Sequence, residues 1–186
     1  PSGSCCSLAV NIVNAGSGSV TLSPPQPNEG YAPGDNVSLT AEAAPGYLFS
    51  HWEGDMTSSD NNTALVTMDG NKTVTAVFNP TVAVVSEPSA GGTVTLEPEQ
   101  PSDGYAAGTE VTAAAIAAEG FRFDRWSGDL SDAESQQTFT VGSPMTIAAH
   151  FTALRPFPWK WVGAGLAGFL LVIFVAYYIR TELPKR

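Results

Sequence analysis

Two acidic segments of the chain carry side chains of the type that could bind a hard cation. Each segment follows a tryptophan and offers the carboxylate or amide oxygens that Ca²⁺ prefers. The candidate ligands are Asp55, Asp60, Asn61 and Asn62 in the first segment and Asp129, Asp132 and Glu134 in the second. Solvated loops have the same composition, so the sequence leaves a calcium site and an ordinary turn both open.

The two histidines, His51 and His150, are the other candidates for chemistry. A serine hydrolase of the common type would carry its nucleophile in a G-x-S-x-G turn, and no such motif occurs in the chain. No Walker-type phosphate loop occurs either. We therefore expect the histidines to lie at the surface or at strand ends, with no enzymatic activity and no cofactor.

The cysteines are adjacent, at Cys5 and Cys6. They form no CxxC or zinc spacing, and neighbouring cysteines rarely bridge each other. Either the N-terminus is lipidated or bridged to another chain, or the two thiols lie on a simple tail. The preceding residues PSGS lack the apolar character of a lipoprotein signal. Three Asn-x-Ser/Thr triplets begin at Asn36, Asn61 and Asn71, a pattern that also arises by chance.

The charge of the chain is unevenly distributed. Of its 18 acidic residues only Glu182 lies beyond residue 154, and only three of its 8 basic residues precede residue 155, so residues 1–154 carry a formal charge of −14. A surface this acidic repels phosphate backbones, which argues against nucleic acid as a partner. The remaining basic residues flank an apolar segment near the C-terminus: Arg155, Lys160, Arg180, Lys185 and Arg186.

The apolar segment runs from Val162 to Ile179 and contains no charged residue. As a helix it would be about 27 Å long, close to the roughly 30 Å of a bilayer core. Aromatic residues stand at both ends, as they do at membrane interfaces: Trp159, Trp161, Tyr177 and Tyr178. A buried core helix is the alternative, but the chain offers too little core to cover one. We predict a transmembrane helix over residues 162–179.

The residues that flank the predicted span set its orientation. More basic residues follow it than precede it, so the positive-inside rule places residues 180–186 in the cytoplasm and the N-terminal domain in the periplasm or outside the cell. Residues 153–161 are the juxtamembrane linker. Small residues at a spacing of four predict contact with another transmembrane helix: Gly163, Ala164, Ala167 and Gly168.

The rest of the chain is a duplication. GYLFSHWEGD begins at Gly46, and GFRFDRWSGD begins 74 residues later at Gly120. The similarity extends without a gap back to GSVTL and GTVTL, and forward, with a separation one residue shorter, to KTVTAVF and MTIAAHF. Such a fixed period indicates repeated structural units. It divides the chain into an N-terminal tail, residues 1–7, and two repeats, residues 8–79 (repeat 1) and 82–152 (repeat 2).

Each repeat is predicted to be β. The segments SVTLS, NVSLTAEA, YLFSHW, ALVTM and TVTAVF alternate in polarity and are separated by Gly, Pro, Asn and Asp. The alanine-rich VTAAAIAA of repeat 2 corresponds to the strand-like VSLTAEAA, so we interpret both as strands. The predicted fold is mainly β, with two tandem small antiparallel modules of sandwich or grasp type followed by one transmembrane helix.

The duplicated motif is interpreted as structural. Phe49 and Trp52 are three residues apart, so both can face one core only if a β-bulge intervenes. The glycine before the strand allows a tight entry, the tryptophan fills a small core, and the aspartate binds backbone amides in the following turn. The motif residues are Gly46, Phe49, Trp52, Gly54 and Asp55 in repeat 1 and Gly120, Phe123, Trp126, Gly128 and Asp129 in repeat 2.

The pattern YxxGxxVxLTAxxxxGYxFxxWxGD followed by TVTAVF resembles the divergent InlB B-repeat of bacterial extracellular proteins. The resemblance covers roughly residues 8–79 and 82–152, and His150 stands where that family usually has valine. It implies a small β-rich module used as a spacer, stalk or adhesion unit, without catalytic residues. The predicted span lies outside the family pattern.

These observations favour a non-enzymatic accessory or scaffold subunit of the cytoplasmic membrane. Its repeats would brace a larger complex, of which respiratory and photosynthetic complexes are examples, and its partners would be the lipid bilayer and other transmembrane and extracytoplasmic subunits. The alternative is a cell-surface adhesin or carbohydrate-binding stalk, in which Tyr31 and Tyr105 would be exposed to stack on sugars. Their identical placement in both repeats argues more for a role in the fold.

Overall fold

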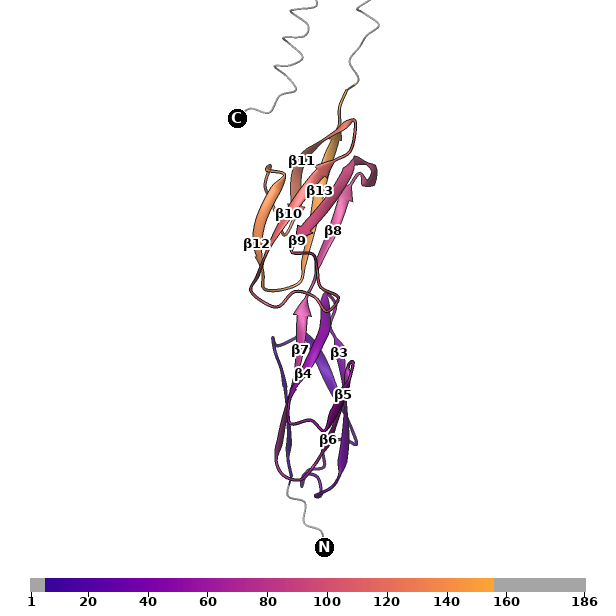
Figure 1. The fold of residues 1–186 in the computed structure, drawn as a ribbon, viewed down its shortest axis with the longest axis vertical. Helices are drawn as coiled ribbons and strands as arrows, with labels where there is room; N and C mark the ends of the chain where they lie inside the picture. The colour runs from indigo at the N-terminus through magenta and orange to yellow at the C-terminus, as the bar shows by residue number, and fades with distance from the viewer. Residues whose placement is uncertain (1–5, 156–186) are drawn as a thin grey trace, which may run out of the picture. The chain divides into compact units, whose positions relative to one another are not determined.

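The computed structural model describes residues 6–155 (Figure 1). Among these residues no helix is both long enough and apolar enough to cross a membrane. Several predictions fall outside the described residues: the span 162–179, the tail 180–186, the interface residues Trp159, Trp161, Tyr177 and Tyr178, the small-residue stripe Gly163, Ala164, Ala167 and Gly168, and Cys5.

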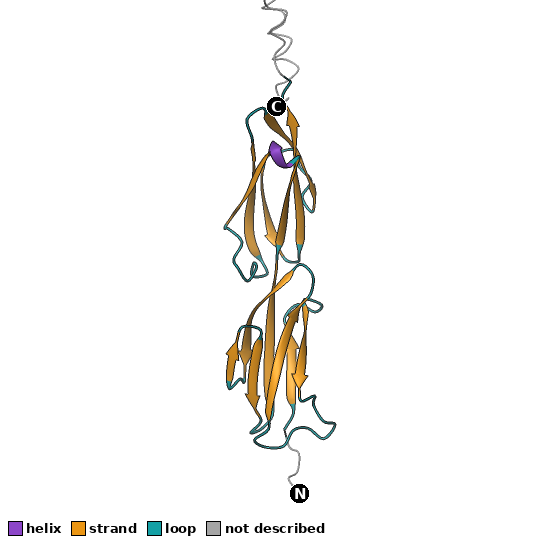
Figure 2. Ribbon diagram, turned by 90° about the vertical axis from the view of Figure 1, so that its right-hand side faces the viewer, coloured by secondary structure: helices purple, strands orange, loops and turns teal. Residues whose placement is uncertain are grey.

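Repeat 1 consists of two small sheets (Figure 2). Its strands are β1 (Leu8–Ile12), β2 (Gly18–Ser23), β3 (Asn36–Ala43), β4 (Tyr47–Gly54), β5 (Ser58–Asp60), β6 (Thr63–Thr67) and β7 (Lys72–Pro80). One sheet has the order β1-β7-β4 and the other β2-β3-β6-β5. In β3 the alternation of apolar and polar residues buries Val37, Leu39 and Ala41, which join residues of the facing sheet in one hydrophobic core.

Repeat 2 has the same plan. Its strands are β8 (Val82–Glu87), β9 (Gly92–Glu97), β10 (Thr109–Ala117), β11 (Phe121–Gly128), β12 (Gln136–Val141) and β13 (Met145–Ala153), with a 3-10 turn at Ser89–Gly91. The sheets have the orders β11-β13-β8 and β12-β10-β9. The alanine-rich segment lies in β10, so its interpretation as a strand is confirmed. No strand corresponding to β5 occurs between β11 and β12.

The two modules are mainly β, as predicted, but they are not purely antiparallel. The first strand of each repeat pairs in parallel with the last, β1 with β7 and β8 with β13. The prediction missed this because it was built on the segments from Gly18 and Gly92 onward and assigned no strand before them. Parallel pairing has a physical consequence: the chain enters each repeat at one end and leaves it at the opposite end. Only Thr81 separates β7 from β8.

Candidate functional site: the repeat motif and the repeat ends

The bulge that the motif spacing requires is present in both repeats. The pairing of β4 with β7 shifts register between Phe49 and His51, so that Ser50 is the extra residue. The extra residue lets Phe49 and Trp52 face the same core, where their ring centroids are 5.3 Å apart. In repeat 2 the corresponding rings of Phe123 and Trp126 are 5.4 Å apart. Both tryptophans are buried, as the sequence predicts for core-filling residues.

The aspartate of the motif ties the end of its strand to the neighbouring strand. The Asp55 amide donates to the Thr73 carbonyl, and the Thr73 amide donates to Asp55 Oδ2, both at 2.9 Å. Asp129 makes the same two bonds to Thr146, at 2.9 and 2.6 Å. These carboxylates are therefore occupied by backbone donors, which is the turn role that the sequence predicts.

The glycine before each aspartate is required by close packing. Gly54 and Gly128 have φ values of 101° and 87°, in the left-handed region that L-residues disfavour. A Cβ at either position would overlap the carbonyl oxygen of Thr73 or Thr146. Gly46 and Gly120, which precede β4 and β11, both have φ of 82°. The conserved spacing within the motif thus reflects backbone geometry.

The tyrosines Tyr31 and Tyr105 are not exposed, so the expectation of a sugar-stacking platform is wrong. Each side chain is about 1% exposed, and each hydroxyl donates to the carbonyl of a proline seven residues earlier, Pro24 at 2.8 Å and Pro98 at 2.7 Å. Burial raises the pKa of both phenols, and the nearby Asp35 carboxylate adds to the effect at Tyr31. Their matching positions serve the fold.

The acidic segments do not assemble a carboxylate cluster. Among residues 6–155 no group of three or more His, Cys, Asp or Glu side chains is close enough to hold a metal ion. Besides the two motif aspartates, Asp132 accepts from the amides of Ala133 and Glu134, which lowers the pKa of its carboxyl. In repeat 1, Asp60 is the exposed last residue of β5, and Asn61 and Asn62 form the exposed turn between β5 and β6. Of the two interpretations, the structure favours ordinary turns.

The histidines lie on the outer faces of their sheets. His51 is exposed and contacts Ser50 and Glu53 through its two ring nitrogens. His150 Nε2 lies 2.7 Å from Ser127 Oγ, and its Nδ1 lies 3.3 Å from a Glu87 carboxylate oxygen. This is the order of a Ser-His-Glu relay, but Ser127 stands within β11 among residues paired with β13. Its surroundings therefore lack the turn that would aim two backbone amides at an oxyanion.

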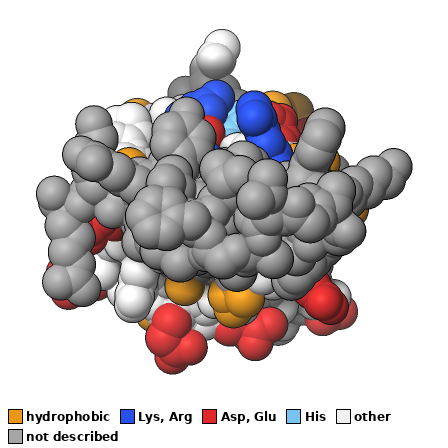
Figure 3. All heavy atoms as spheres, turned by 90° about the horizontal axis from the view of Figure 1, so that it is seen from above, with side chains coloured by type: hydrophobic (Ala, Val, Ile, Leu, Met, Phe, Trp, Pro, Cys, Tyr) orange, Lys and Arg blue, Asp and Glu red, His pale blue; other side chains and the backbone are white. Residues whose placement is uncertain are grey.

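Basic side chains gather where the chain leaves repeat 2. Arg122 pairs with Thr152 and Arg125 pairs with His150 across the sheet, and Arg155 follows the last strand. Figure 3 looks onto this end and shows basic side chains beside a histidine, with acidic ones at the rim. Arg125 contacts Asp124 at 2.8 Å. In an otherwise acidic domain, this end is the place where positive charge concentrates.

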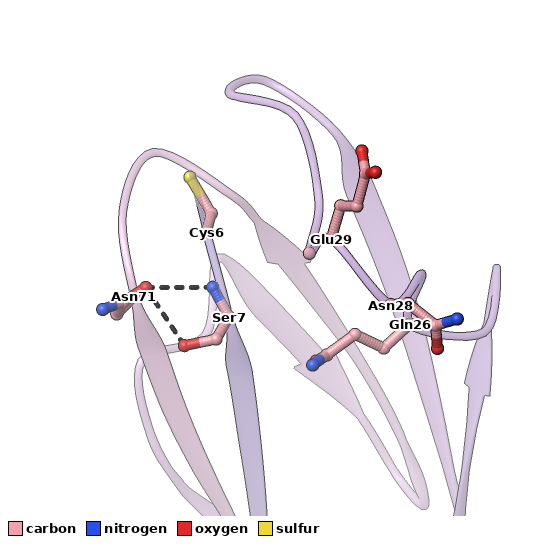
Figure 4. A pocket seen from close by; sticks show the side chains of 7 residues that line it. Cys6, Ser7, Gln26, Asn28, Glu29 and Asn71 are labelled. Atoms are coloured by element: carbon pink, nitrogen blue, oxygen red, sulfur yellow. Dashed lines mark hydrogen bonds between the residues drawn. The ribbon is translucent and has the colours of Figure 1, made fainter. Parts of the chain in front are cut away.

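A polar hollow of about 330 Å³ lies at the opposite end, where the chain enters repeat 1 (Figure 4). It is lined by Cys6, Ser7, Gln26, Asn28, Glu29, Gly30 and Asn71. The Ser7 amide and hydroxyl both donate to Asn71 Oδ1, at 2.9 and 3.0 Å. The Cys6 side chain is buried, and lipidation of Cys5 or Cys6 stays a prediction.

The corresponding end of repeat 2 meets repeat 1. The Ser50 hydroxyl donates to Asp103 Oδ2 at 2.7 Å, and the Tyr105 amide donates to the Pro80 carbonyl at 3.0 Å. Sequence reasoning missed these contacts because each joins residues of two different repeats: Ser50 lies within the motif of repeat 1, but its partner Asp103 belongs to repeat 2. The 74-residue offset could have pointed to this position, because it aligns Asp103 with Glu29 of the hollow, and each of these acidic residues precedes a Gly-Tyr pair.

Comparison with known proteins agrees with this architecture. No curated protein and no solved structure gives a significant match to the chain. The family model of the divergent InlB B-repeat domain matches twice, over residues 8–82 and 81–155. The two matches coincide with the two β modules, and together they cover most of the chain. The chain therefore belongs to the divergent InlB B-repeat family, of which it carries two tandem copies.

Proposed function

We propose that the chain is a non-enzymatic accessory or scaffold subunit, anchored in the cytoplasmic membrane by residues 162–179. Its two β repeats stand on the extracytoplasmic side and brace other subunits of a membrane complex. The lipid bilayer and the transmembrane helices of those subunits are the partners of the anchor. Residues 180–186 lie in the cytoplasm.

The link between the repeats is the observation that carries the bracing role. One residue, Thr81, connects β7 to β8, and both its amide and its hydroxyl donate to the Gly46 carbonyl at 2.9 Å. Ser50 and Asp103 add a second tie across the boundary. A short link with hydrogen bonds on both sides resists bending, which suits a spacer and gives no advantage to an enzyme.

Two further observations support this proposal. The side chains that the repeats share are used by the fold: the tryptophans in the cores, the aspartates on backbone amides and the tyrosines on proline carbonyls. The arginines gather at the end of repeat 2 from which the chain continues toward residues 162–179. Basic side chains beside a membrane are attracted to anionic headgroups, with about 1 kcal/mol for each residue near the surface.

Purification from native membranes tests the proposal. In mild detergent the full chain is expected to co-purify with other integral membrane subunits in fixed stoichiometry, as identified by mass spectrometry. Gly163→Leu and Gly168→Leu should release these partners while the chain stays in the membrane, because larger residues block close helix approach. Val172→Leu, outside the small-residue stripe, is the control. A chain that is extracted alone, or that leaves the membrane in carbonate, would contradict the proposal.

The adhesin alternative has lost its main support. Its sugar-stacking residues, Tyr31 and Tyr105, are buried and hydrogen-bonded within the fold. We therefore do not propose carbohydrate binding through these tyrosines.

A further inference from the structure

The two repeats present equivalent N-terminal ends in two different environments. The N-terminal end of repeat 2 contacts repeat 1, whereas the N-terminal end of repeat 1 forms the polar hollow. The backbone frame is the same at both. The Leu8 amide donates to Gln26 Oε1 at 3.0 Å, and the Val82 amide donates to Gln100 Oε1 at 2.7 Å. The two ends can therefore be compared residue by residue.

Cys6, just before repeat 1, is equivalent in position to Pro80, just before repeat 2. The Tyr31 amide donates to the Cys6 carbonyl at 2.8 Å, as the Tyr105 amide donates to that of Pro80. A Cβ on Gly30 would lie 2.7 Å from the Cys6 carbonyl oxygen, and one on Gly104 would lie 2.9 Å from that of Pro80. The entering strand thus approaches the same glycine in both repeats, and Cys6 holds the position before repeat 1 that Pro80, the last residue of β7, holds before repeat 2.

Repeat 1 makes several contacts with the N-terminal end of repeat 2, including one from the Asn79 side-chain amide to Asp103 Oδ2 at 3.5 Å. The Ser50 hydroxyl donates to Asp103, and the Gly46 carbonyl accepts from Thr81. Gly46 also packs against Pro144, since a Cβ there would lie 2.6 Å from the proline Cβ. These contacts leave Asp103 only partly exposed.

At the N-terminal end of repeat 1, a hydrogen bond within the repeat replaces the one that Thr81 makes to Gly46. Among the described residues, nothing replaces the hydrogen bond that Ser50 makes to Asp103. Asn71 stands where repeat 2 has Pro144, and its Oδ1 takes the amide and hydroxyl of Ser7, the counterpart of Thr81. Glu29, the counterpart of Asp103, is exposed and has no hydrogen-bond partner among the described residues. Figure 4 shows its carboxylate at the rim of the hollow. The acceptor is kept, and no described residue donates to it.

We propose that the hollow is a docking site for the end of another β repeat, which offers Glu29 a hydroxyl from its bulge as Ser50 offers one to Asp103. The partner must carry serine or threonine at the bulge. Repeat 2 of a second copy does not qualify, because Asp124 stands at that position and would place one carboxylate against another. The inference rests on the proposed bracing function in taking the partner to be a protein module.

A chain with three repeats tests the docking site directly. A second copy of residues 7–80 is inserted after Cys6, so that its Pro80 precedes the original Ser7 and its Ser50 faces the original Glu29. Hydrogen exchange then measures the opening equilibrium of the original repeat 1. In this chain Glu29→Ala removes the hydrogen bond between the inserted Ser50 and the Glu29 carboxylate. Because hydrogen bonds to charged groups are strong, the substitution should increase the opening of the original repeat 1 by about tenfold or more. In the natural two-repeat chain the same substitution should change opening by less than about twofold, because an exposed, unpaired side chain is lost.

Two variants make the result specific. Asp103→Ala in the natural chain is the positive control and should increase opening of the β8 end of repeat 2 by about tenfold. In the three-repeat chain, Ser50→Ala in the inserted copy should remove most of the effect of Glu29→Ala, as coupled partners do in a double-mutant cycle. If Glu29→Ala is neutral in the three-repeat chain while Asp103→Ala is not, or if the inserted copy unfolds independently, the docking site is refuted. Neither outcome depends on the membrane partners that test the proposed function.

Discussion

In repeat 2 the indole Nε1 of Trp126 donates to the Glu134 carbonyl at 2.9 Å, whereas in repeat 1 the Nε1 of Trp52 is buried without a hydrogen-bond partner among the described residues. The local strand structure explains the difference. In repeat 1 the segment after the motif forms β5, which pairs with β6. Repeat 2 has no such strand, so the Glu134 carbonyl is available to the indole.

The comparison distinguishes the contacts that both repeats have from those that occur in only one repeat. Both repeats keep the bulge, the Asp–Thr backbone pair and the Tyr–Pro hydrogen bond. They differ in one loop and in the environment of one end. A shared contact should therefore contribute similarly to both repeats, and a contact found in only one repeat should affect that repeat alone.

The largest expected effect concerns the motif glycines. Gly54→Ala and Gly128→Ala should each destabilise their own repeat by about 3 kcal/mol or more, because a left-handed φ is strained and the methyl group overlaps a backbone carbonyl. Hydrogen exchange on peptides from β4 and β11 measures each repeat separately.

A second pair of glycines provides the control. Gly34 and Gly108 share a φ of 91°, but a Cβ there would meet nothing within 4 Å. Gly34→Ala and Gly108→Ala should therefore cost only the strain of the left-handed conformation, about 1–2 kcal/mol. If all four variants lost the same stability, close packing at the motif would not be the cause.

The tryptophans should respond unequally. Trp52→Phe and Trp126→Phe remove similar volume from equivalent cores, but only Trp126→Phe also breaks a hydrogen bond and leaves the Glu134 carbonyl without its donor. We expect Trp126→Phe to cost about 1–3 kcal/mol more, measured by urea unfolding of the full chain in detergent. Equal costs would mean that the Trp126 hydrogen bond adds nothing net to the stability of repeat 2.

Much of the fold could be predicted from the sequence because its determinants are local or repeated. Alternation identified strands such as β3, the 74-residue offset identified the duplication, and the spacing of Phe49 and Trp52 required the bulge. The strand and bulge inferences rest on a few consecutive residues, and the duplication rests on a motif that occurs twice. The family match supports the same division of the chain.

The parallel strand pairs and the ends of the repeats were harder to predict. β1 pairs with β7 across more than fifty intervening residues, and neither strand indicates its partner by composition. The tie between Ser50 and Asp103 joins two repeats, so no pattern within one repeat reveals it. The identical placement of the tyrosines pointed to a role in the fold, but their residue type does not reveal that each is buried with its hydroxyl on a proline carbonyl. For the parallel strands and the tie between the repeats, long-range pairing was the missing information.

The smallest expected effect is shared by both repeats and depends on pH. The folded-state pKa values of Tyr31 and Tyr105 are raised above the ordinary value of 10.0, so their stabilising contribution is complete below pH 10 and is lost as pH rises through the folded pKa. The urea midpoint of the full chain should therefore fall at alkaline pH. Tyr31→Phe and Tyr105→Phe should each cost about 1 kcal/mol at pH 7, because a proline carbonyl loses its donor, and should flatten the alkaline decline. A decline that survives in the double variant would assign it to other groups, and a cost confined to one variant would show that this shared contact is not equivalent in the two repeats.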